Sequence, residues 1–288
     1  MMKLQTPVTL DPAPVSISYN DRILVVGSCF ADEIGGRLAD AGFKAMPNPF
    51  GTLYNPISIG NALARLSSGV PFTEEDVVEM GAGAGKVCSF WHHTSFARET
   101  AEAFLENANA KLEEASAFWK ECNKVIITLG TAWAFRYNET GETVANCLKR
   151  PAMEFTRYRL TVAQTAAILN GLVQRNPGKE FIFTVSPIRH LADGAHGNQL
   201  SKSTLLLATE GLPYFPAYEI MMDELRDYRW WAEDMVHPTK QAAAYLCDRF
   251  IEWTLPVREW DLYESKMKEW RRSQHRPLYS SENSMMPE

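Results

Sequence analysis

The sequence lacks the features that mark several protein classes. No stretch approaches the roughly 20 apolar residues that cross a bilayer, and residues 1–20 contain no apolar core of a signal peptide. The five cysteines include no C-x-x-C pair, which argues against a zinc knuckle or a thioredoxin-type redox pair. Glycine-rich phosphate loops and internal repeats are also missing. We therefore expect a cytoplasmic protein with reduced thiols, no cofactor and no membrane span.

Charge and composition are those of an ordinary folded protein. Of the 288 residues, 29 are Lys or Arg and 35 are Asp or Glu, which gives a net charge of −6. This mild acidity disfavours nucleic-acid binding, because phosphate neutralisation needs a concentrated basic surface. The hydrophobic fraction of 45% is enough for one core or at most two. We expect a single domain over residues 1–255 and a charged, aromatic extension over 256–288, with a disordered tail from Ser280 to Glu288.

Strand-like and helix-like segments alternate along the chain. Short β-branched or apolar runs predict strands at 22–26, 43–46, 125–129, 181–185 and 214–218. Apolar spacing and capping residues predict helices at 30–41, 56–66, 99–120, 161–174, 198–209 and 238–250. A hairpin is expected over 134–147, and two short antiparallel strands within 70–96. The alternation indicates an α/β fold with a mostly parallel central sheet and inserted loops or hairpins.

The expected topology points to one edge of this sheet. In parallel α/β sheets the active cleft lies beyond the carboxyl ends of the strands. The segments that meet this condition are 27–29, 48–55, 130–131 and 186–190. The turn 234–237, just before the last core helix, can join them. These segments also hold the most unusual residues of the chain, so we expect the functional site there.

Ser28 is the first candidate catalytic residue. It follows the strand at 22–26 and precedes a helix, so its hydroxyl is expected at the mouth of the cleft. The backbone N–H groups and the dipole of that helix favour negative charge at the same point. This setting suits a nucleophile whose substrate develops an oxyanion. The alternative is that Ser28 only caps the helix, and its position alone favours that alternative.

Asp234 and His237 supply the groups that a serine nucleophile needs. An Asp three residues before a His can accept a hydrogen bond from the imidazole Nδ1, which leaves Nε2 to take a proton from serine. A serine hydroxyl is a weak nucleophile without such a base. The alternative is that Asp234 caps the last helix and His237 packs beside it. Together with the strand-end serine far upstream, the pattern favours a triad of Ser28, His237 and Asp234.

The segment Gly27-Ser28-Cys29-Phe30-Ala31 looks like the signature of the GSCFA family. That family resembles the SGNH/GDSL hydrolases, whose three-layer α/β/α fold is flavodoxin-like. In those hydrolases a serine of the first sequence block acts with a D-x-x-H motif of the last block. The resemblance covers about residues 22–250. It implies that Ser28 is the nucleophile, His237 the general base and acid, and Asp234 its orienting partner, and it implies no particular substrate.

The same resemblance implies an oxyanion hole that this sequence matches only in part. In SGNH hydrolases the donors are the serine N–H, a second-block glycine N–H and a third-block asparagine side chain. Ser28 and Gly51 match the first two donors, whereas Ala132 stands where the asparagine is expected. One such donor is worth roughly 10²–10³ in rate. The candidate replacements are Asn48, Asn55, Thr131, His92 and His93.

Other residues of the expected cleft have two interpretations each. Arg189 can bind a substrate carboxylate or phosphate, or it can form a structural ion pair. His92 and His93 can contact the substrate or the oxyanion, but a packed or surface pair of imidazoles is favoured. Two further alternatives are disfavoured, namely Cys29 as the nucleophile and a metal cluster of His190, Asp193 and His196.

The sequence thus predicts an SGNH-type esterase that cleaves or transfers an acyl ester. SGNH relatives often act on carbohydrate O-acetyl groups, and Trp91 or Trp133 can stack on a sugar, so the expected partner is a small-molecule or glycan ester. The absence of a G-x-S-x-G elbow disfavours an α/β-hydrolase. One alternative is a non-catalytic glycan-binding protein that keeps the hydrolase fold, as the missing asparagine suggests. Another is a phosphate-binding flavodoxin-like domain, which the missing phosphate loop disfavours.

Overall fold

A five-stranded parallel sheet forms the centre of the computed structural model, which describes residues 6–81 and 83–274. The predicted disordered tail from Ser280 to Glu288 lies outside these residues. The strands are β1 (Arg22–Gly27), β2 (Lys44–Pro47), β5 (Lys124–Leu129), β9 (Glu180–Val185) and β10 (Tyr214–Phe215). They lie in the order β10-β9-β5-β1-β2, and every neighbouring pair is parallel. Counted among these five strands alone, this is the flavodoxin-like order 2-1-3-4-5.

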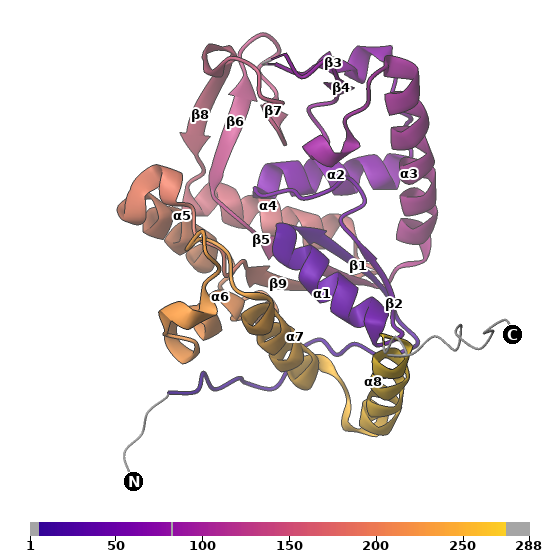
Figure 1. Cartoon of the computed structure of the whole chain (residues 1–288), viewed down its shortest axis with the longest axis vertical. Helices are drawn as coiled ribbons and strands as arrows, with labels where there is room; N and C mark the ends of the chain where they lie inside the picture. The colour runs from indigo at the N-terminus through magenta and orange to yellow at the C-terminus, as the bar shows by residue number, and fades with distance from the viewer. Residues whose placement is uncertain (1–5, 82, 275–288) are drawn as a thin grey trace, which may run out of the picture.

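Helices cover both faces of the sheet and give three layers (Figure 1). One face packs on α2 (Pro56–Ser68), α3 (Ala101–Glu121), α4 (Val162–Arg175) and α5 (Gly194–Ala208). The other face packs on α1 (Cys29–Asp40), α7 (Lys240–Thr254) and α8 (Trp260–Gln274). Successive side chains of a strand point to opposite faces, so Leu24 and Val26 join the first core and Ile23 and Val25 the second. The predicted three-layer α/β fold is confirmed.

Local sequence explains where the helices begin. Asn55 caps α2, since its Oδ1 accepts a hydrogen bond from Ser58 N–H at 2.9 Å, and Pro56 occupies the first helical position. Thr161 caps α4 and forms a capping box with Gln164. Ser28 caps α1 through its side-chain oxygen. Ser28 therefore caps the helix, as one interpretation predicted, and this position at the start of α1 is also the one that the catalytic interpretation requires.

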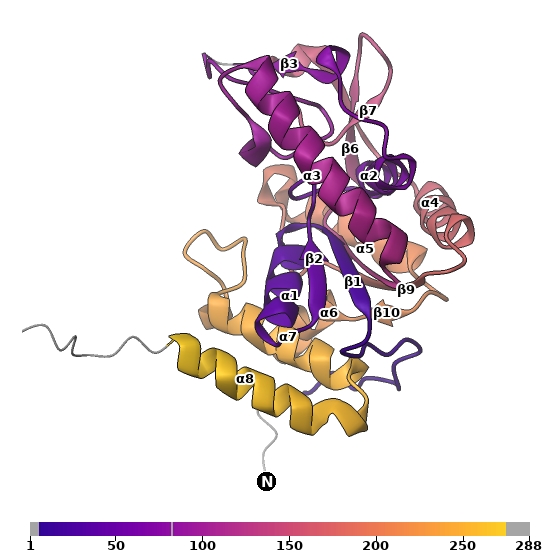
Figure 2. The same cartoon turned by 90° about the vertical axis from the view of Figure 1, so that its right-hand side faces the viewer.

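Two small antiparallel sheets project from the central sheet, at the end away from α7 and α8 (Figures 1 and 2). One pairs β3 (Val78–Glu79) with β4 (Val87–Cys88), as predicted for 70–96. The other has the order β7-β6-β8 and contains β6 (Trp133–Tyr137), β7 (Thr143–Val144) and β8 (Phe155–Arg159). The hairpin predicted over 134–147 is β6 and β7. Sequence periodicity did not predict β8.

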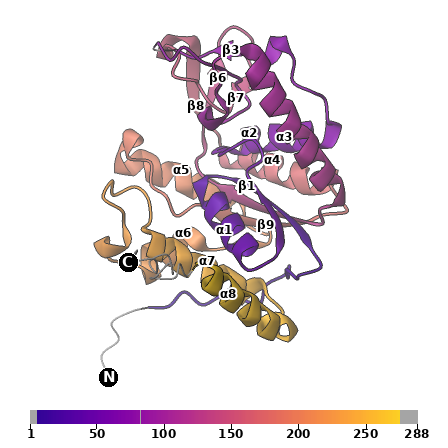
Figure 3. The ribbon, with the colours of Figure 1, turned by 45° about the vertical axis from the view of Figure 1, so that its right-hand side comes forward.

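Near the end of the chain one predicted strand is shorter than expected, and a helix for which no prediction was made follows residue 255. The strand predicted over 214–218 stops at Phe215, and the chain continues as the short helix α6 (Ala217–Glu219) and a single π-helical turn. The extension after residue 255 contains the helix α8, which lies beside α7 (Figure 3). Its Tyr263 and Met267 are buried in the core that α1 and α7 also form. None of the helices in the described ranges combines the length and the apolar character that crossing a bilayer requires.

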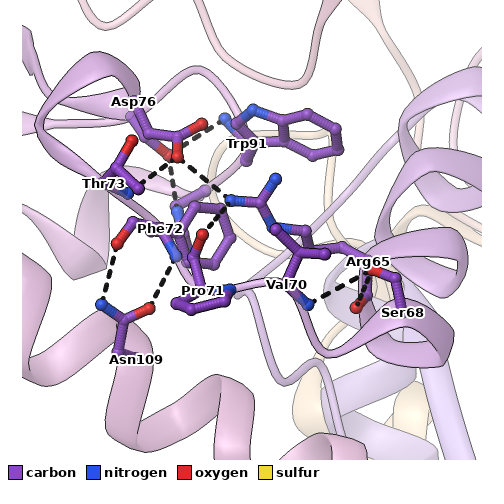
Figure 4. Close-up of polar contacts among 11 residues, drawn as sticks. Arg65, Ser68, Val70, Pro71, Phe72, Thr73, Asp76, Trp91 and Asn109 are labelled. Carbon is purple, nitrogen blue, oxygen red and sulfur yellow. Dashed lines mark hydrogen bonds and ion pairs between the residues drawn. The ribbon is translucent and has the colours of Figure 1, made fainter.

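Arg65, at the end of α2, anchors the segment that leads to β3 (Figure 4). Its Nη2 donates to the Asp76 carboxylate at 3.0 Å and to the Pro71 carbonyl oxygen at 2.9 Å. The guanidinium lies 4.1 Å from the Phe72 ring centroid and 5.3 Å from that of Trp91. Charge pairing and cation–π contacts both hold this side chain. We call Arg65, Asp76, Pro71, Phe72 and Trp91 the Arg65 cluster.

Candidate functional site

A cavity of about 510 Å³ opens at the carboxyl ends of β1, β5 and β9. Segments far apart in the sequence line it, including Ser28 and Cys29 after β1, Gly130 and Thr131 after β5, residues 186 and 188–193 after β9, and Val236 and His237. Trp133, Phe135 and Arg157 of the β7-β6-β8 sheet form a further wall. In the flavodoxin-like order, the strand order reverses at β1, so this is where such folds bind ligands.

Ser28 lies at the floor of this cavity and is 1% exposed. Its Oγ accepts a hydrogen bond from Phe30 N–H at 3.3 Å and lies 3.0 Å from Thr128 Oγ1. The chain reaches this position through Gly27, whose φ of 140° is a conformation that favours glycine. A Cβ at Gly27 would clash with the Thr128 carbonyl oxygen. The close approach of β1 and β5 therefore fixes the serine.

The side chain of Asn48 also holds the backbone at Gly27 and Ser28 in place. Its Oδ1 accepts from Gly27 N–H at 2.9 Å, and its Nδ2 donates to Ser28 O at 3.3 Å and to Asp32 Oδ1 at 2.9 Å. Both N–H groups of the Asn48 amide are thus used inside the protein. Asn48 positions the serine and has no donor left for a substrate oxyanion.

Asp234 and His237 form the hydrogen bond that their spacing predicts. His237 Nδ1 lies 2.6 Å from Asp234 Oδ2. Asp234 Oδ1 accepts from the backbone N–H groups of Val236 and His237, at 2.9 and 3.0 Å. These two backbone bonds, together with the imidazole contact, lower the pKa of Asp234 to about 2. The carboxylate is therefore ionised near neutral pH and can orient the imidazole with Nε2 free.

Ser28 and His237 line the same cavity, although no hydrogen bond joins them among the residues that the structure describes. Both side chains of the Asp234–His237 pair are 51% exposed, at the outer rim, whereas Ser28 is buried. The rim turn is held by Ala232 N–H donating to His237 O at 2.8 Å and by Arg189 N–H donating to Val236 O at 3.1 Å. Catalytic hydrogen bonds are often long before substrate binds.

The two backbone donors expected for an oxyanion are used inside the protein. Ser28 N–H donates to Thr128 O at 3.0 Å, and Gly51 N–H donates to Asn48 O at 2.8 Å. Gly51 also lies outside the residues that line the cavity, with His93 packed against it. The structure therefore does not place Gly51 where a second-block donor is expected.

Asn55 and Thr131 are the candidate donors that do line the cavity. Asn55 Nδ2 donates to Ser58 Oγ at 2.9 Å, which uses one of its two N–H groups. Thr131 Oγ1 lies 3.0 Å from Ser201 Oγ and accepts from Trp133 N–H. Ala132, which stands at the expected asparagine position, is fully buried and donates its N–H to Ser201 Oγ. Asn55 is thus the side chain with an N–H to spare at the cavity.

The two neighbouring histidines lie away from the cavity. His92 is fully buried among Phe50, Phe72, Phe96 and Phe104, and its Nδ1 lies 2.7 Å from Ser89 Oγ. Burial, with the charge of Arg65, lowers the pKa of His92 to about 3, so this imidazole is neutral. His93 caps a short turn by accepting from Ser95 N–H. The packed interpretation of His92 fits these contacts better than a substrate contact does.

The two tryptophans that were candidates for sugar stacking separate in space. Trp133 lines the cavity, and the Arg157 guanidinium lies 4.1 Å from its ring centroid. Trp91 is in the Arg65 cluster and lines other hollows of the surface. The Arg159 guanidinium lies 6.0 Å from the Trp133 ring centroid, so two cations contact Trp133, and its buried indole N–H has no partner among the described residues.

Lys202 is a residue of the site that sequence reasoning missed. It is fully buried behind the cavity wall, and its Nζ donates to Gly130 O and Ser186 O, both at 2.8 Å. It thus ties the loop after β5 to the loop after β9. Burial lowers the pKa of Lys202 to about 7. The pKa of His190 is lowered to about 4, mainly by burial and next by the charge of Lys202.

Cys29 and the imagined metal cluster gain no support as functional groups. Burial, together with the charge of Asp32, raises the pKa of the Cys29 thiol to about 11, so the reactive thiolate is scarce near neutral pH. Across the described ranges, no group of three or more His, Cys, Asp or Glu side chains is arranged to hold a metal ion. Asp193 instead pairs with Arg157 at 2.5 Å.

Comparison with known proteins places the chain in a family. The model described as the GSCFA family matches residues 22–250, which include both the Ser28 segment and the Asp234–His237 pair, so the chain belongs to that family. No curated protein matches the chain. The family match by itself assigns no reaction to the site.

Proposed function

We propose that this member of the GSCFA family is a serine hydrolase that cleaves or transfers an acyl ester. The observation that carries the proposal is the pairing of Asp234 with His237 on the rim of the cavity that has Ser28 at its floor. A bound ester can lie between the two, with its carbonyl carbon near Ser28 Oγ and its leaving oxygen toward His237. The three residues then have the roles of nucleophile, base and orienting carboxylate.

The proposed reaction has two steps. Ser28 Oγ attacks the ester carbonyl while His237 Nε2 takes the hydroxyl proton, and His237 then returns that proton to the departing alcohol. Water, or a hydroxyl of an acceptor molecule, attacks the acyl-serine in the same way and releases the acyl group. The ionised Asp234 stabilises the imidazolium that forms in each step. The acyl group alone moves, so no cofactor is required.

We assign the oxyanion to the N–H of Cys29 and to Asn55, one of the candidate replacements, because the N–H groups of Ser28 and Gly51 are already bonded inside the protein. The N–H of Cys29, at the first position of α1, has no acceptor within the helix. The second N–H of Asn55 Nδ2 is the side-chain donor on the cavity wall. The positive end of the α1 dipole adds to both. In this proposal Asn55 replaces the missing third-block asparagine.

The cavity is suited to a small ester, which can be part of a glycan or a free metabolite. We propose that the protein meets this ester in the cytoplasm. The cavity volume of about 510 Å³ accommodates a short acyl group with one ring of an alcohol. Tyr54, Trp133 and Phe135 supply aromatic walls. A carbohydrate O-acetyl group is one ester of this size, and a long fatty acyl chain is not.

The decisive experiment is covalent labelling with a fluorophosphonate probe. We expect the wild type to be labelled, Ser28→Ala to lose all labelling, and Ser186→Ala, a second buried serine of the same cavity, to keep it. Asp234→Asn should lower the rate of ester hydrolysis by about 10²–10⁴, and Asn55→Ala by about 10²–10³. If the wild type is not labelled, or if Ser28→Ala is labelled equally, the hydrolase proposal is wrong.

A second candidate is a binding protein that keeps the hydrolase fold without turnover. Two observations favour it, namely the internal bonds of the Ser28 and Gly51 N–H groups and the separation of exposed His237 from buried Ser28. It predicts that acetylated sugars bind in the cavity and are recovered unchanged. Any turnover of these esters that depends on Ser28 excludes this candidate.

A further inference from the structure

Arg189 is an arginine of the cavity wall with an unusual set of partners. Its guanidinium lies 4.0 Å from the ring centroid of Trp231, and its Nη2 donates to Met235 O at 2.5 Å. No carboxylate lies within ion-pair distance of it in the part of the chain that the structure describes. A guanidinium has five N–H donors, and the described residues accept from one of them. The stacking and the carbonyl bond fix the group and leave its charge unpaired.

Several other partly buried arginines are neutralised by carboxylates, whereas Arg98 donates to three backbone carbonyl oxygens and has no carboxylate partner among the described residues. Two partly buried guanidinium groups donate to carboxylates, Arg37 to Asp248 and Arg65 to Asp76, as does the more exposed Arg157 to Asp193. A buried Nε without a partner occurs at Arg37 and Arg65 as well as at Arg189, so that feature does not set Arg189 apart. Arg189 is set apart by the combination of a missing carboxylate partner and a place on the cavity wall, which Arg98 does not line.

The charges around the cavity do not compensate for it. Asp193, which lines the cavity, forms an ion pair with Arg157. The carboxylate of Asp234 is hydrogen-bonded to the His237 ring and to two backbone N–H groups. Lys202, behind the wall, donates to two carbonyl oxygens and forms no ion pair with a described residue. Of the charged side chains that line the cavity, Arg157 and Asp193 thus pair with each other, and Arg189 has no carboxylate partner among the described residues.

We infer that the ligand of this cavity is an ester that carries an anionic group, a carboxylate or a phosphate, and that Arg189 binds this group. The inference rests on the proposed function for the ester, but the anion site stands on the geometry of Arg189 alone. A fixed guanidinium with donors to spare is suited to bidentate contact with two oxyanion oxygens. The indole N–H of Trp133, buried in the same wall without a partner, is a further donor for the ligand.

Turnover of matched probes tests the inference. We would measure kcat/KM for 4-acetoxybenzoate and neutral 4-acetoxybenzamide, for monophenyl succinate and neutral phenyl butanoate, and for 4-acetoxyphenyl phosphate. The first two pairs place the anion on the alcohol side or on the acyl side, and the last compound distinguishes phosphate from carboxylate. The readout is the ratio of anionic to neutral kcat/KM within one protein sample, so a loss of folded protein cancels.

The variants are Arg189→Gln, Arg189→Lys and the control Arg136→Gln. Arg136 is an exposed arginine of β6 that does not line the cavity, and its substitution removes the same charge. We expect the ratio for at least one anionic ester to fall about 10- to 100-fold in Arg189→Gln, to fall less in Arg189→Lys, and to stay unchanged in Arg136→Gln. An equal ratio in wild type and Arg189→Gln, whatever the absolute rates, would overturn the inference and leave the hydrolase proposal standing.

A binding measurement separates this inference from the proposed reaction. Titration calorimetry on Ser28→Ala, with 4-acetamidobenzoate against neutral 4-acetamidobenzamide, needs no turnover. We expect the carboxylate to bind more tightly, and the preference to disappear when Arg189→Gln is added. If no ester is hydrolysed but this preference is found, the hydrolase proposal fails and the anion site holds. If neither amide is preferred and no anionic ester is favoured in the turnover assay, the anion site is wrong.

Discussion

Two arginines of similar surroundings have opposite electrostatic settings. Arg65, in the Arg65 cluster, lies over aromatic rings, donates to a backbone carbonyl and pairs with the Asp76 carboxylate (Figure 4). Arg189, on the cavity wall, lies over the Trp231 ring and donates to the Met235 carbonyl, but it has no carboxylate partner among the described residues. Charge pairing is therefore the one clear difference between the two.

The difference shows where the protein keeps uncompensated charge. An arginine that only holds two segments together is best neutralised, because an unpaired charge away from water costs free energy. Around the cavity, both Arg189 and Lys202 lack that neutralisation. A site that binds an anion or stabilises a developing negative charge needs such cations. We therefore expect the Arg65 cluster to contribute to stability, the buried charge of Lys202 to reduce it, and Arg189 to contribute less than Arg65.

The largest expected effect concerns Lys202. Its pKa is about 7 when folded, against 10.5 as the ordinary value, so between these pH values the unfolded chain binds the additional proton. The free energy of unfolding should then rise with pH by up to about 1.4 kcal/mol per pH unit. Urea denaturation of wild type and Lys202→Met at pH 7.5 and 9.5 checks this. The wild type should gain on the order of 2–3 kcal/mol relative to the variant.

An equal pH dependence in the two proteins would contradict this expectation. It would mean that Lys202 stays protonated throughout and that its charge is compensated after all. Lys124→Met is a matched control, because Lys124 is also buried but pairs with Glu180.

The next effect is the loss of the Arg65 ion pair. Arg65→Met leaves Asp76 with its bond from Thr73 N–H but without a cation. Breaking a fully buried pair costs about 3–5 kcal/mol, and since these side chains are 14% and 18% exposed, we expect about 2 kcal/mol. Denaturation midpoints measure it. The double variant Arg65→Met, Asp76→Asn should recover part of the loss, because no unpaired carboxylate remains.

Arg189→Met should have a smaller effect on stability. The substitution removes one carbonyl hydrogen bond and the stacking on Trp231 but leaves no carboxylate without its partner. We expect a loss of about 1 kcal/mol or less, measured under the same conditions as for Arg65→Met. A loss equal to that of Arg65→Met would remove the contrast between the two arginines and indicate a mainly structural role for Arg189.

Much of the fold could be predicted because its central strands are continuous apolar runs. Every residue of β5 is buried, as is typical of a parallel sheet covered on both faces. The strand β8 was missed because three of its five residues are exposed and its sequence, F-T-R-Y-R, has no apolar run. It forms because β6 supplies a partner strand, and such a partner is not visible within a short window of sequence.

The site could be predicted only where it depends on local spacing. The Asp234–His237 hydrogen bond follows from three residues of separation in a turn. The internal bonding of Ser28 N–H instead follows from the register that sets Gly27 opposite Thr128, and strand register across 101 residues is not a local property. Lys202 lies in a segment predicted as a helix, and its burial was not predicted, because a lysine is almost never fully buried. Its one signal is a helical spacing of three and seven residues from buried Leu205 and Thr209.

The last and smallest effect is a direct test of the charge behind the cavity. Burial and then Lys202 lower the pKa of His190 to about 4. At pH 4–6 Lys202 is protonated, so its removal in Lys202→Met should raise the pKa of His190, though not fully to 6.5, because burial remains. Nuclear magnetic resonance of the His190 ring proton against pH measures this. An unchanged pKa would mean that the Lys202 charge does not reach the cavity, and the positive potential would then rest on Arg189 alone.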